Sequence, residues 1–547
     1  MEKNYLGVML DCSRNAVMKV SAVKKFIDDL ALMGYNCLQL YTEDTYEIDG
    51  EPLFGHFRGR YSQNELKEID EYAESKGIEI IPCIQTLAHL NCIFEYPLYM
   101  KNYRDVADIL LSGEEKTYAL IEKMFATMRK CFKSKRINIG MDEAHMLGLG
   151  TYLDKNGYHE RFDILLKHLY RVCEIAKKYD FYPMMWSDMF FRIVSHGEYR
   201  NLSAEIPQWV MDKVPENVSL VYWDYRSESP EVCGGMLDKH LLFNREVWFG
   251  GAAWKWQGFH SGNEFSFKKI ETAISECNKR NVKNILITLW GDDGNECQAA
   301  AIYPSLVYAA ECAKGNFDVD NAKRKFEALF GENFDDFMLC DMKMPDNIPK
   351  DMLIANGVKE MLYCDPFLGR FDACVIGDGS ESKWLSSLAE EFKRAAERSV
   401  NHKLMFESYA ALAKAVSVKY DLGYRTRIAY KNEDKKALCA VYEDYGKTIL
   451  YIESFLDAFR KFWMSVNKPQ GFDVQDIRIG GLLQRLRYCK ARLDAYIKGE
   501  ITEIEELNED MVDYYYPDNK SKKPICYNRY KPAATVNVLA FCTFNED

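Results

Sequence analysis

The chain has 547 residues, 48% of them hydrophobic, a length and composition that predict two or three globular domains with sizeable cores. Its net charge of −12 argues against nucleic acid as the main partner, because phosphate binding requires a basic surface. No apolar run is long enough to span a bilayer, so no membrane segment is expected.

The 17 cysteines are scattered, and no Cys-x-x-Cys pair occurs among them. This usage is typical of buried thiols in a reducing compartment rather than of a disulfide framework or a zinc site. The chain begins Met-Glu-Lys-Asn-Tyr, without a basic segment followed by an apolar one, so no signal peptide is visible. We therefore expect a cytoplasmic protein.

From the first residues to about residue 315, short apolar runs alternate with amphipathic stretches. The runs are rich in Val, Ile, Leu and Tyr, and the stretches between them show the 3.6-residue period of helices. Strands are predicted at residues 5–11, 36–42, 79–85, 137–141, 183–187, 219–223, 247–253 and 284–289. Helices are predicted at residues 20–33, 64–76, 115–132, 162–178, 230–243, 264–280 and 299–312.

Eight successive strand-then-helix units predict an α/β fold, a (β/α)₈ TIM barrel over residues 1–315. A doubly wound sheet gives the same alternation, but it normally carries a glycine-rich phosphate turn after its first strand, and none is present. Beyond residue 315 helical patterns dominate, at residues 322–330, 383–399, 402–420, 435–466 and 477–497. Gly331 is expected to cap the first of them. We expect a mostly α-helical C-terminal domain over residues 316–547.

Polar and aromatic residues gather where the predicted strands end. In a (β/α)₈ barrel these ends meet at one mouth, which is where such folds carry out chemistry. The residues at the strand ends are Asp11, Ser13, Arg14, Glu43, Asp44, His89, Asp142, Glu143, Asp188, Asp224, Tyr225, Trp254, Trp256, Trp290, Asp292 and Asp293. A random acidic surface would not be confined to strand ends, so we expect a single acidic and aromatic pocket.

The tryptophans of the barrel half narrow the class of ligand. Five of them fall on or just after predicted strands, namely Trp186, Trp223, Trp254, Trp256 and Trp290. Indole rings pack against the flat C–H faces of sugars, while carboxylates and an arginine bind the hydroxyls. Any single tryptophan is as often a core residue as a binding residue, but five together with these charges favour a carbohydrate ligand.

The adjacent carboxylates Asp142 and Glu143 end an alternating apolar run. An ionised Asp142 disfavours a second negative charge beside it, which would keep Glu143 protonated near neutral pH. Neighbouring side chains of a regular strand point to opposite faces. Both acids are therefore expected to reach one substrate only if the strand ends there and the backbone turns.

Six motifs follow one another along the barrel half, at residues 7–14 (GVMLDCSR), 40–47 (LYTEDTYE), 58–61 (RGRY), 139–145 (IGMDEAH), 223–225 (WDY) and 289–292 (LWGD). In sequence and order they resemble glycoside hydrolase family 20, the β-N-acetylhexosaminidases, and most closely its intracellular hexosaminidase D-like branch. The helical half is also similar, notably at residues 471–481 (GFDVQDIRIGG). The resemblance implies exo-acting hydrolysis of terminal β-linked GlcNAc and/or GalNAc from small glycosides or oligosaccharides, without a metal or organic cofactor.

The mechanism that the resemblance implies uses the substrate itself as the nucleophile. The 2-acetamido carbonyl attacks the anomeric carbon, an oxazolinium-type intermediate forms, and the anomeric configuration is retained. Glu143 matches the general acid, and Asp142 matches the carboxylate that holds the acetamido N–H. Tyr225 matches the hydroxyl that binds the acetamido oxygen.

The resemblance also implies substrate-binding residues. Arg14 matches an arginine that binds the O3 and O4 hydroxyls, and His89 falls where many members have Pro-Gly-His. Asp292 stands where secreted members usually have a glutamate that binds O4 and O6, so a shorter reach and acceptance of both gluco and galacto substrates are expected. The tryptophans expected to surround the sugar ring and its acetamido group are Trp186, Trp223, Trp254 and Trp290.

Other functions fit the sequence less well. The chitinase pattern Asp-x-x-Asp-x-Asp-x-Glu is absent, the O-GlcNAc hydrolases use adjacent aspartates, and no His-x-His or His-Glu-x-x-His metal motif occurs. A non-catalytic carbohydrate-binding barrel is the alternative from another class, although Asp142, Glu143 and Tyr225 all survive together. The helical half is expected to brace the barrel or to form a homodimer interface.

Overall fold

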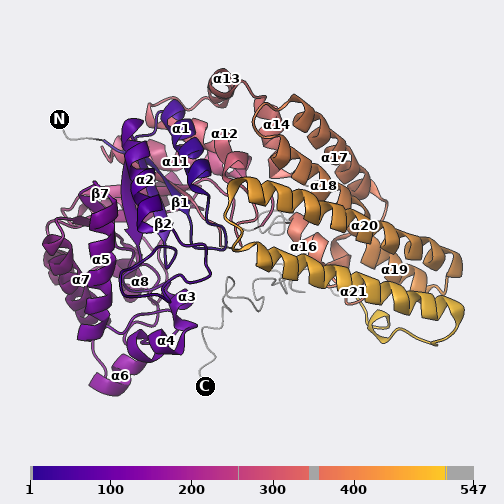
Figure 1. Ribbon diagram of the computed structural model, residues 1–547, viewed down its shortest axis with the longest axis horizontal. Coiled ribbons are helices and arrows are strands. Elements are labelled where there is room, and N and C mark those ends of the chain that lie inside the picture. The colour runs from indigo at the N-terminus through magenta and orange to yellow at the C-terminus, as the bar shows by residue number, and fades with distance from the viewer. Residues whose placement is uncertain (1–3, 257, 293, 344–356, 512, 514–547) are drawn as a thin grey trace.

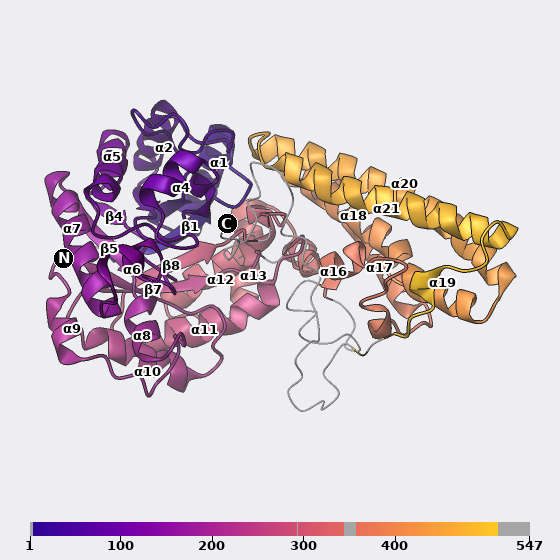
Figure 2. The ribbon, with the colours of Figure 1, turned by 90° about the horizontal axis from the view of Figure 1, so that it is seen from below.

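The computed structural model of the chain describes residues 4–256, 258–292, 294–343, 357–511 and 513. Two parts lie side by side along the longest axis of the molecule (Figure 1). The indigo-to-magenta part is a barrel surrounded by helices, and the orange-to-yellow part consists of long helices. The view from below shows the same division (Figure 2).

Eight parallel strands close into a barrel in the order β1 to β8, with β8 paired to β1. They are β1 (Leu6–Asp11), β2 (Cys37–Thr42), β3 (Glu79–Ile84), β4 (Arg136–Asn138), β5 (Tyr182–Trp186), β6 (Ser219–Trp223), β7 (Val247–Ala252) and β8 (Asn284–Leu289). The predicted (β/α)₈ barrel is confirmed.

The alternation of side chains along each strand builds two cores. In β1, Val8 and Leu10 face the surrounding helices, whereas Met9 lies inside the barrel. In β5, Met185 faces outward, and Trp186 packs into the barrel interior. The interior is thereby filled with side chains, so a ligand can enter only at an end of the barrel.

Amphipathic helices cover the outside of the barrel. They are α1 (Val20–Met33), α2 (Gln63–Ser75), α5 (Glu115–Cys131), α7 (Arg161–Lys178), α10 (Pro230–Leu241), α11 (Asn263–Lys279) and α12 (Tyr303–Ala313). The loops at the strand ends contain shorter helices, namely α3 (Asn91–Phe94), α4 (Pro97–Tyr103), α6 (Thr151–Asn156), α8 (Asp188–Val194), α9 (Gln208–Lys213) and the 3₁₀ turn η1 (Ala299–Ile302). The prediction of one helix over 299–312 is wrong in part, because α12 begins as a new helix at Tyr303, with Pro304 in its first turn, after η1.

Strand β4 is shorter than the predicted 137–141. Gly140 and Met141 have φ values of 70° and 73°, which take the backbone out of the extended conformation. A Cβ on Gly140 would lie 2.0 Å from Oε1 of Gln85, so only glycine fits at this position. The strand therefore ends at Asn138, before the two acids.

The second part is helical, as predicted. Its helices are α13 (Val319–Phe330), α14 (Phe334–Met338), α16 (Gly357–Tyr363), α17 (Ser380–Arg398), α18 (Lys403–Lys419), α19 (Leu422–Lys431), α20 (Lys435–Val466) and α21 (Phe472–Lys498). Gly331 caps α13 with a φ of 63°, which confirms its predicted role. Helix α21 begins five residues before the predicted 477. No helix within the described ranges is long and apolar enough to cross a membrane.

The predicted division at residues 315 and 316 falls between α12 and α13, which pack against each other. That boundary stays a prediction. The part of the predicted helical domain after residue 513 lies outside the described residues.

Candidate active site

A pocket opens at the end of the barrel to which the carboxyl ends of the strands point. We call it the site pocket. It is lined by Arg14, His89, Asp142, Glu143, Trp186, Arg200, Trp223, Tyr225, Arg226, Trp256, Trp290 and Asp292. Nine of the ten site residues predicted from the sequence are in this set, so the structure brings them together. Their roles stay predictions.

Trp254 is the exception, because it does not line the site pocket. Its backbone forms a bridge with Gly262, and its amide donates to Oγ of Ser266 at 2.8 Å. These contacts turn its ring toward Phe265 and a neighbouring cavity. Trp256, whose ring centroid is 3.9 Å from that of Trp254, presents the indole to the site pocket instead. The structure therefore places Trp256, and not Trp254, among the lining residues, and the expectation that Trp254 surrounds the sugar stays a prediction.

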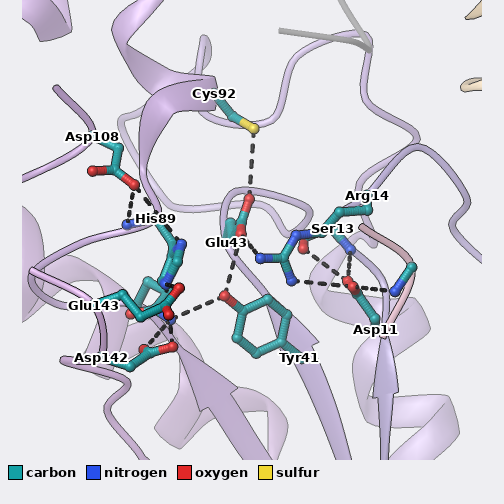
Figure 3. Close-up of polar contacts among 12 residues, drawn as sticks. Asp11, Ser13, Arg14, Tyr41, Glu43, His89, Cys92, Asp108, Asp142 and Glu143 are labelled. Carbon is teal, nitrogen blue, oxygen red and sulfur yellow. Dashed lines mark hydrogen bonds and ion pairs between the residues drawn. The ribbon is translucent and has the colours of Figure 1, made fainter. Parts of the chain in front are cut away.

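An unusual backbone aims both acids into the site pocket. Glu143 has a φ of 51° and His89 a φ of 58°, in the left-handed region that costs a non-glycine residue about 1–2 kcal/mol. With Gly140 and Met141, three of the four residues from 140 to 143 have positive φ. The regular alternation of side chains is lost, and Asp142 and Glu143 both face His89 (Figure 3). The expected turn of the backbone is confirmed.

Asp142 is held by two donors. Nε2 of Gln85 donates to its Oδ1 at 2.9 Å, and Nε2 of His89 lies 3.2 Å from its Oδ2. Burial opposes the charge on Asp142, but the His89 charge and the two hydrogen bonds outweigh it and lower the pKa of Asp142 below its ordinary value. Asp142 is thus an ionised carboxylate at neutral pH.

His89 lies among three carboxylates (Figure 3). Its Nε2 is 3.8 Å from Oε2 of Glu143, and its Nδ1 is 3.8 Å from Oδ2 of Asp108, which also accepts the His89 backbone N–H at 3.2 Å. Burial disfavours the imidazolium, but Asp142 and then Asp108 outweigh burial and raise the pKa of His89 to about 10. His89 is therefore charged at neutral pH.

The pair of His89 and Asp142 makes stability depend on pH. We expect His89→Gln to lower the free energy of unfolding by about 3 kcal/mol at pH 6, because it leaves a buried carboxylate without its cation. The raised pKa of His89 means that its contribution is complete below about pH 6.5, its value in the unfolded chain, and disappears as the pH rises through about 10. Urea unfolding at pH 6, 8 and 10 measures this.

The exposed His196 supplies the control, and His196→Gln should change the unfolding free energy little at any pH. A His89→Gln difference that stays constant from pH 6 to 10 would contradict the assigned charge. Below about pH 4 the difference should also shrink, because Asp142, whose pKa is lowered, becomes protonated in the unfolded and then in the folded chain.

Glu143 has a cationic neighbour that the sequence did not reveal. Nη2 of Arg192 lies 3.1 Å from Oε1 of Glu143, and Nε of Arg192 donates to Asp188 at 2.8 Å. Asp188 also accepts the Glu143 backbone N–H at 3.1 Å. Burial first, and then the Asp142 charge, raise the pKa of Asp188 to about 7. Glu143 is thus flanked by a cation as well as by an anion, and the expectation that Asp142 keeps it protonated near neutral pH stays a prediction.

Arg14 is fixed at the opposite edge of the site pocket. Its Nη1 lies 3.1 Å from Asp11 and its Nη2 lies 3.2 Å from Glu43 (Figure 3). Its guanidinium carbon is 4.9 Å from the Tyr41 ring and 5.1 Å from the Trp290 ring. Two carboxylates and two rings hold the planar group, which suits forked recognition of hydroxyls.

Aromatic rings form the floor and walls. Trp186 is only 1% exposed and forms the floor, with its ring centroid 6.1 Å from that of Trp290. The Tyr225 ring stacks on Trp223 at 5.0 Å and meets Trp256 edge-on at 5.8 Å. Burial raises the pKa of Tyr225 well above its ordinary value, so its hydroxyl stays neutral and can donate.

Several site residues were not predicted, namely Gln85, Asp108, Arg192, Arg200 and Arg226. Gln85 follows β3 directly, and Arg192 lies one helical turn after Asp188, so position and spacing were usable signals for these two. Asp108 comes from the loop between α4 and α5, where the sequence carries no such signal. Within the part of the chain that the structure describes, no group of three His, Cys, Asp or Glu side chains forms a metal site.

Two family models match the chain. The model described as the glycosyl hydrolase family 20 catalytic domain matches residues 4–231, and the model described as the glycoside hydrolase 20C C-terminal domain matches residues 335–526. The first match contains every lining residue of the site pocket up to Arg226, and the second covers most of the helical part.

Curated relatives match parts of the chain. The human protein named hexosaminidase D is 25% identical over 224 residues, which are 39% of this chain and 44% of the human protein. The bovine protein of the same name is 24% identical over 257 residues, 44% of this chain and 68% of that protein. The match thus spans less than half of the human relative.

Among solved structures, the GH20 exo-β-N-acetylglucosaminidase of Vibrio harveyi in complex with N-acetylglucosamine is similar to this chain, with a TM-score of 0.45. Its sequence is 17% identical, and the comparison covers 60% of this chain and 57% of that chain.

Proposed function

Since the chain belongs to glycoside hydrolase family 20, we propose that it is an exo-acting β-N-acetylhexosaminidase. In this proposal it releases terminal, non-reducing β-linked GlcNAc and GalNAc from small glycosides or oligosaccharides. The observation that carries the proposal is the meeting of Asp142, Glu143 and Tyr225 in one pocket lined by tryptophans.

The proposed reaction is substrate-assisted and retains the anomeric configuration. The acetamido oxygen attacks the anomeric carbon as the bond to the leaving oxygen breaks, and Glu143 gives that oxygen its proton. Water, deprotonated by Glu143, then adds to the anomeric carbon of the oxazolinium-type intermediate, and the acetamido group is restored. The guanidinium of Arg192 at 3.1 Å suits the carboxylate that Glu143 becomes between the two steps.

Asp142 and Tyr225 would orient the nucleophile. The lowered pKa of Asp142 keeps it ionised, so it can accept the acetamido N–H and balance the positive charge that develops on the ring. The neutral hydroxyl of Tyr225 would donate to the acetamido oxygen and fix its angle of attack. The anion and the hydroxyl reach the site pocket from the ends of β4 and β6.

The buried floor supports the exo mode of action. Trp186 closes the site pocket below, and the barrel interior beneath it is filled by Met9, Ile81 and Trp248. A sugar ring can therefore enter only from the open end, which fits a terminal residue rather than the middle of a polysaccharide chain.

The proposal predicts which aryl glycosides the protein cleaves. We expect hydrolysis of the 4-nitrophenyl β-glycosides of both GlcNAc and GalNAc, with kcat/KM values within about a hundredfold of each other. The β-glucoside should be at least about a thousandfold slower, because it lacks the acetamido nucleophile. Initial rates measure this, and proton NMR of the first sugar released should show the β-anomer.

Three results would contradict the proposed function. Equal turnover of the β-glucoside would contradict substrate assistance, and a ratio above about a hundredfold between the two acetamido substrates would contradict dual specificity. Binding of N-acetylglucosamine without turnover of any substrate would favour a non-catalytic carbohydrate-binding barrel.

A further inference from the structure

The helical part reaches the barrel beside the residues that line the site pocket. The turn between α20 and α21 runs antiparallel to residues 12–19, which we call the β1 loop. The amide of Lys19 donates to the carbonyl of Val466 at 2.9 Å, and the amide of Lys468 donates to that of Val17 at 2.8 Å. The β1 loop carries Arg14, which lines the site pocket, so this contact lies next to the site.

Two glycines let the backbones approach closely. Gly471 precedes α21, and a Cβ there would lie 2.3 Å from the carbonyl oxygen of Asn15. Gly294 has a φ of 111°, and its Cβ would lie 2.8 Å from Nη1 of Arg478 and 2.9 Å from Nδ2 of Asn15. The start of α21, the β1 loop and the chain after β8 therefore meet without room for one more carbon atom.

A buried carboxylate joins these segments. Glu296 lies two residues after Gly294, and it accepts from Nη1 of Arg478 at 3.0 Å and from Nζ of Lys359 at 2.7 Å. The side chains of Glu296, Arg478 and Lys359 are 0%, 3% and 7% exposed. Ion pairs so far from solvent are little screened and are directional. Helices α21 and α16 thus both hold one acid of the barrel.

Glu296 is the last residue of the turn that carries Asp292. We call residues 291, 292 and 294–296 the β8 turn. The amides of residues 294 and 295 both donate to the carbonyl of Gly291, at 2.9 and 2.8 Å. The amide of Gly291 donates to Oδ2 of Asp11 at 2.9 Å, and the same oxygen lies 3.1 Å from Arg14. The β8 turn, Asp11 and Arg14 therefore form one connected unit.

We propose that Arg478 is a positioning residue for substrate recognition. Through Glu296 it holds the β8 turn, and through that turn it sets where Asp292 and Arg14 stand in the site pocket. The helical domain thereby determines how the hydroxyls of the terminal sugar are bound, an inference that rests on the proposed function. The proposed reacting groups come from the ends of β4 and β6, so loss of Arg478 should affect binding more than chemistry.

The test compares variants of the full chain. Arg478→Met keeps the length of the side chain and removes its charge, and Arg478→Lys keeps the charge. The matched control is Arg485→Met, because Arg485 lies on the same helix and pairs with Asp365 of the helical part, at 2.6 Å. For each variant we would measure the melting temperature, kcat and KM on the 4-nitrophenyl β-N-acetylglucosaminide, and the Kd of N-acetylglucosamine by calorimetry.

Arg478→Met is expected to raise KM and Kd about tenfold while kcat changes less than about threefold. Arg478→Lys should recover most of the loss, and Arg485→Met should leave KM and Kd unchanged even if its melting temperature falls. Equal KM and Kd values in Arg478→Met and Arg485→Met would overturn the inference. So would a fall in kcat at constant KM, which indicates a smaller fraction of active protein.

If Arg478→Met does not fold, Gly294→Ala tests the inference by a change in the chain after β8. Its added carbon presses on Arg478 and Asn15, so the same rise in KM and Kd supports the inference, and unchanged values overturn it. A wild-type protein that neither cleaves the substrate nor binds N-acetylglucosamine would contradict both the proposed function and this inference. Active wild type with an ineffective Arg478→Met removes only the inference.

Discussion

Replacement of Glu143 by Gln is expected to lower kcat/KM about a thousandfold on a substrate whose aglycone is a second sugar. The variant keeps the shape of the side chain and an oxygen for Arg192 at the 3.1 Å contact, but it has no proton to give. The loss should be smaller on a 4-nitrophenyl glycoside, because nitrophenolate leaves without protonation. Rates of sugar release from a β-linked N-acetylglucosamine disaccharide and from the aryl glycoside measure both effects.

The control for this variant is Glu74→Gln. Glu74 is exposed, lies on α2 away from the site pocket and pairs with the exposed Lys133. It should leave both rates unchanged. If Glu143→Gln lost equal factors on the two substrates, Glu143 would not be the proton donor to the leaving group, and the proposed mechanism would fail at its first step.

Asp142→Asn is expected to lower kcat about 300-fold, the second largest effect. The amide can still meet the acetamido group, but it no longer carries the charge that balances the oxazolinium-type intermediate. The same change removes the main cause of the raised pKa of His89, so that pKa should fall from about 10 toward neutrality. Steady-state rates test the first effect, and NMR titration of the His89 ring tests the second.

Asp108→Asn is the matched control, since it removes another of the three carboxylates around His89, 3.8 Å from Nδ1, and Asp108 does not line the site pocket. It should lower the pKa of His89 less than Asp142→Asn does and leave kcat within about tenfold. A kcat for Asp142→Asn close to that of wild type would exclude a role for this charge in the reaction, even if the His89 titration behaved as expected.

The sequence predicted the barrel well because each strand and helix has its own apolar period. Asp142, Glu143 and Tyr225 could be found because they follow strands, and strand ends meet at one place in this fold. The sequence could not separate Trp254 from Trp256. Which of the two rings lines the site pocket depends on a backbone bridge between Trp254 and Gly262. The apolar periodicity of the sequence does not indicate such a bridge.

Contacts between distant segments could not be predicted either, because periodicity describes single strands and helices and not the contacts between them. Asp108 reaches His89 from a loop without regular structure, and the cation at Glu143 comes from the helix after the next strand. The motif at residues 471–481 was recognisable, but nothing in it indicated that Arg478 pairs with Glu296, which lies 182 residues earlier in the chain. Only the packing of α21 against the barrel connects them.

The β1 loop also sets an order of events during synthesis. Lys19 bonds both to the carbonyl of Val466 and, through its side chain, to that of Met464, 445 positions later in the chain. At about 5–20 residues per second, a ribosome needs roughly 20–90 s to make the intervening segment. The eight strands can leave the ribosome and close long before then. The loop that carries Arg14 must wait, so the nascent barrel is expected to acquire its fold first and its finished binding edge last.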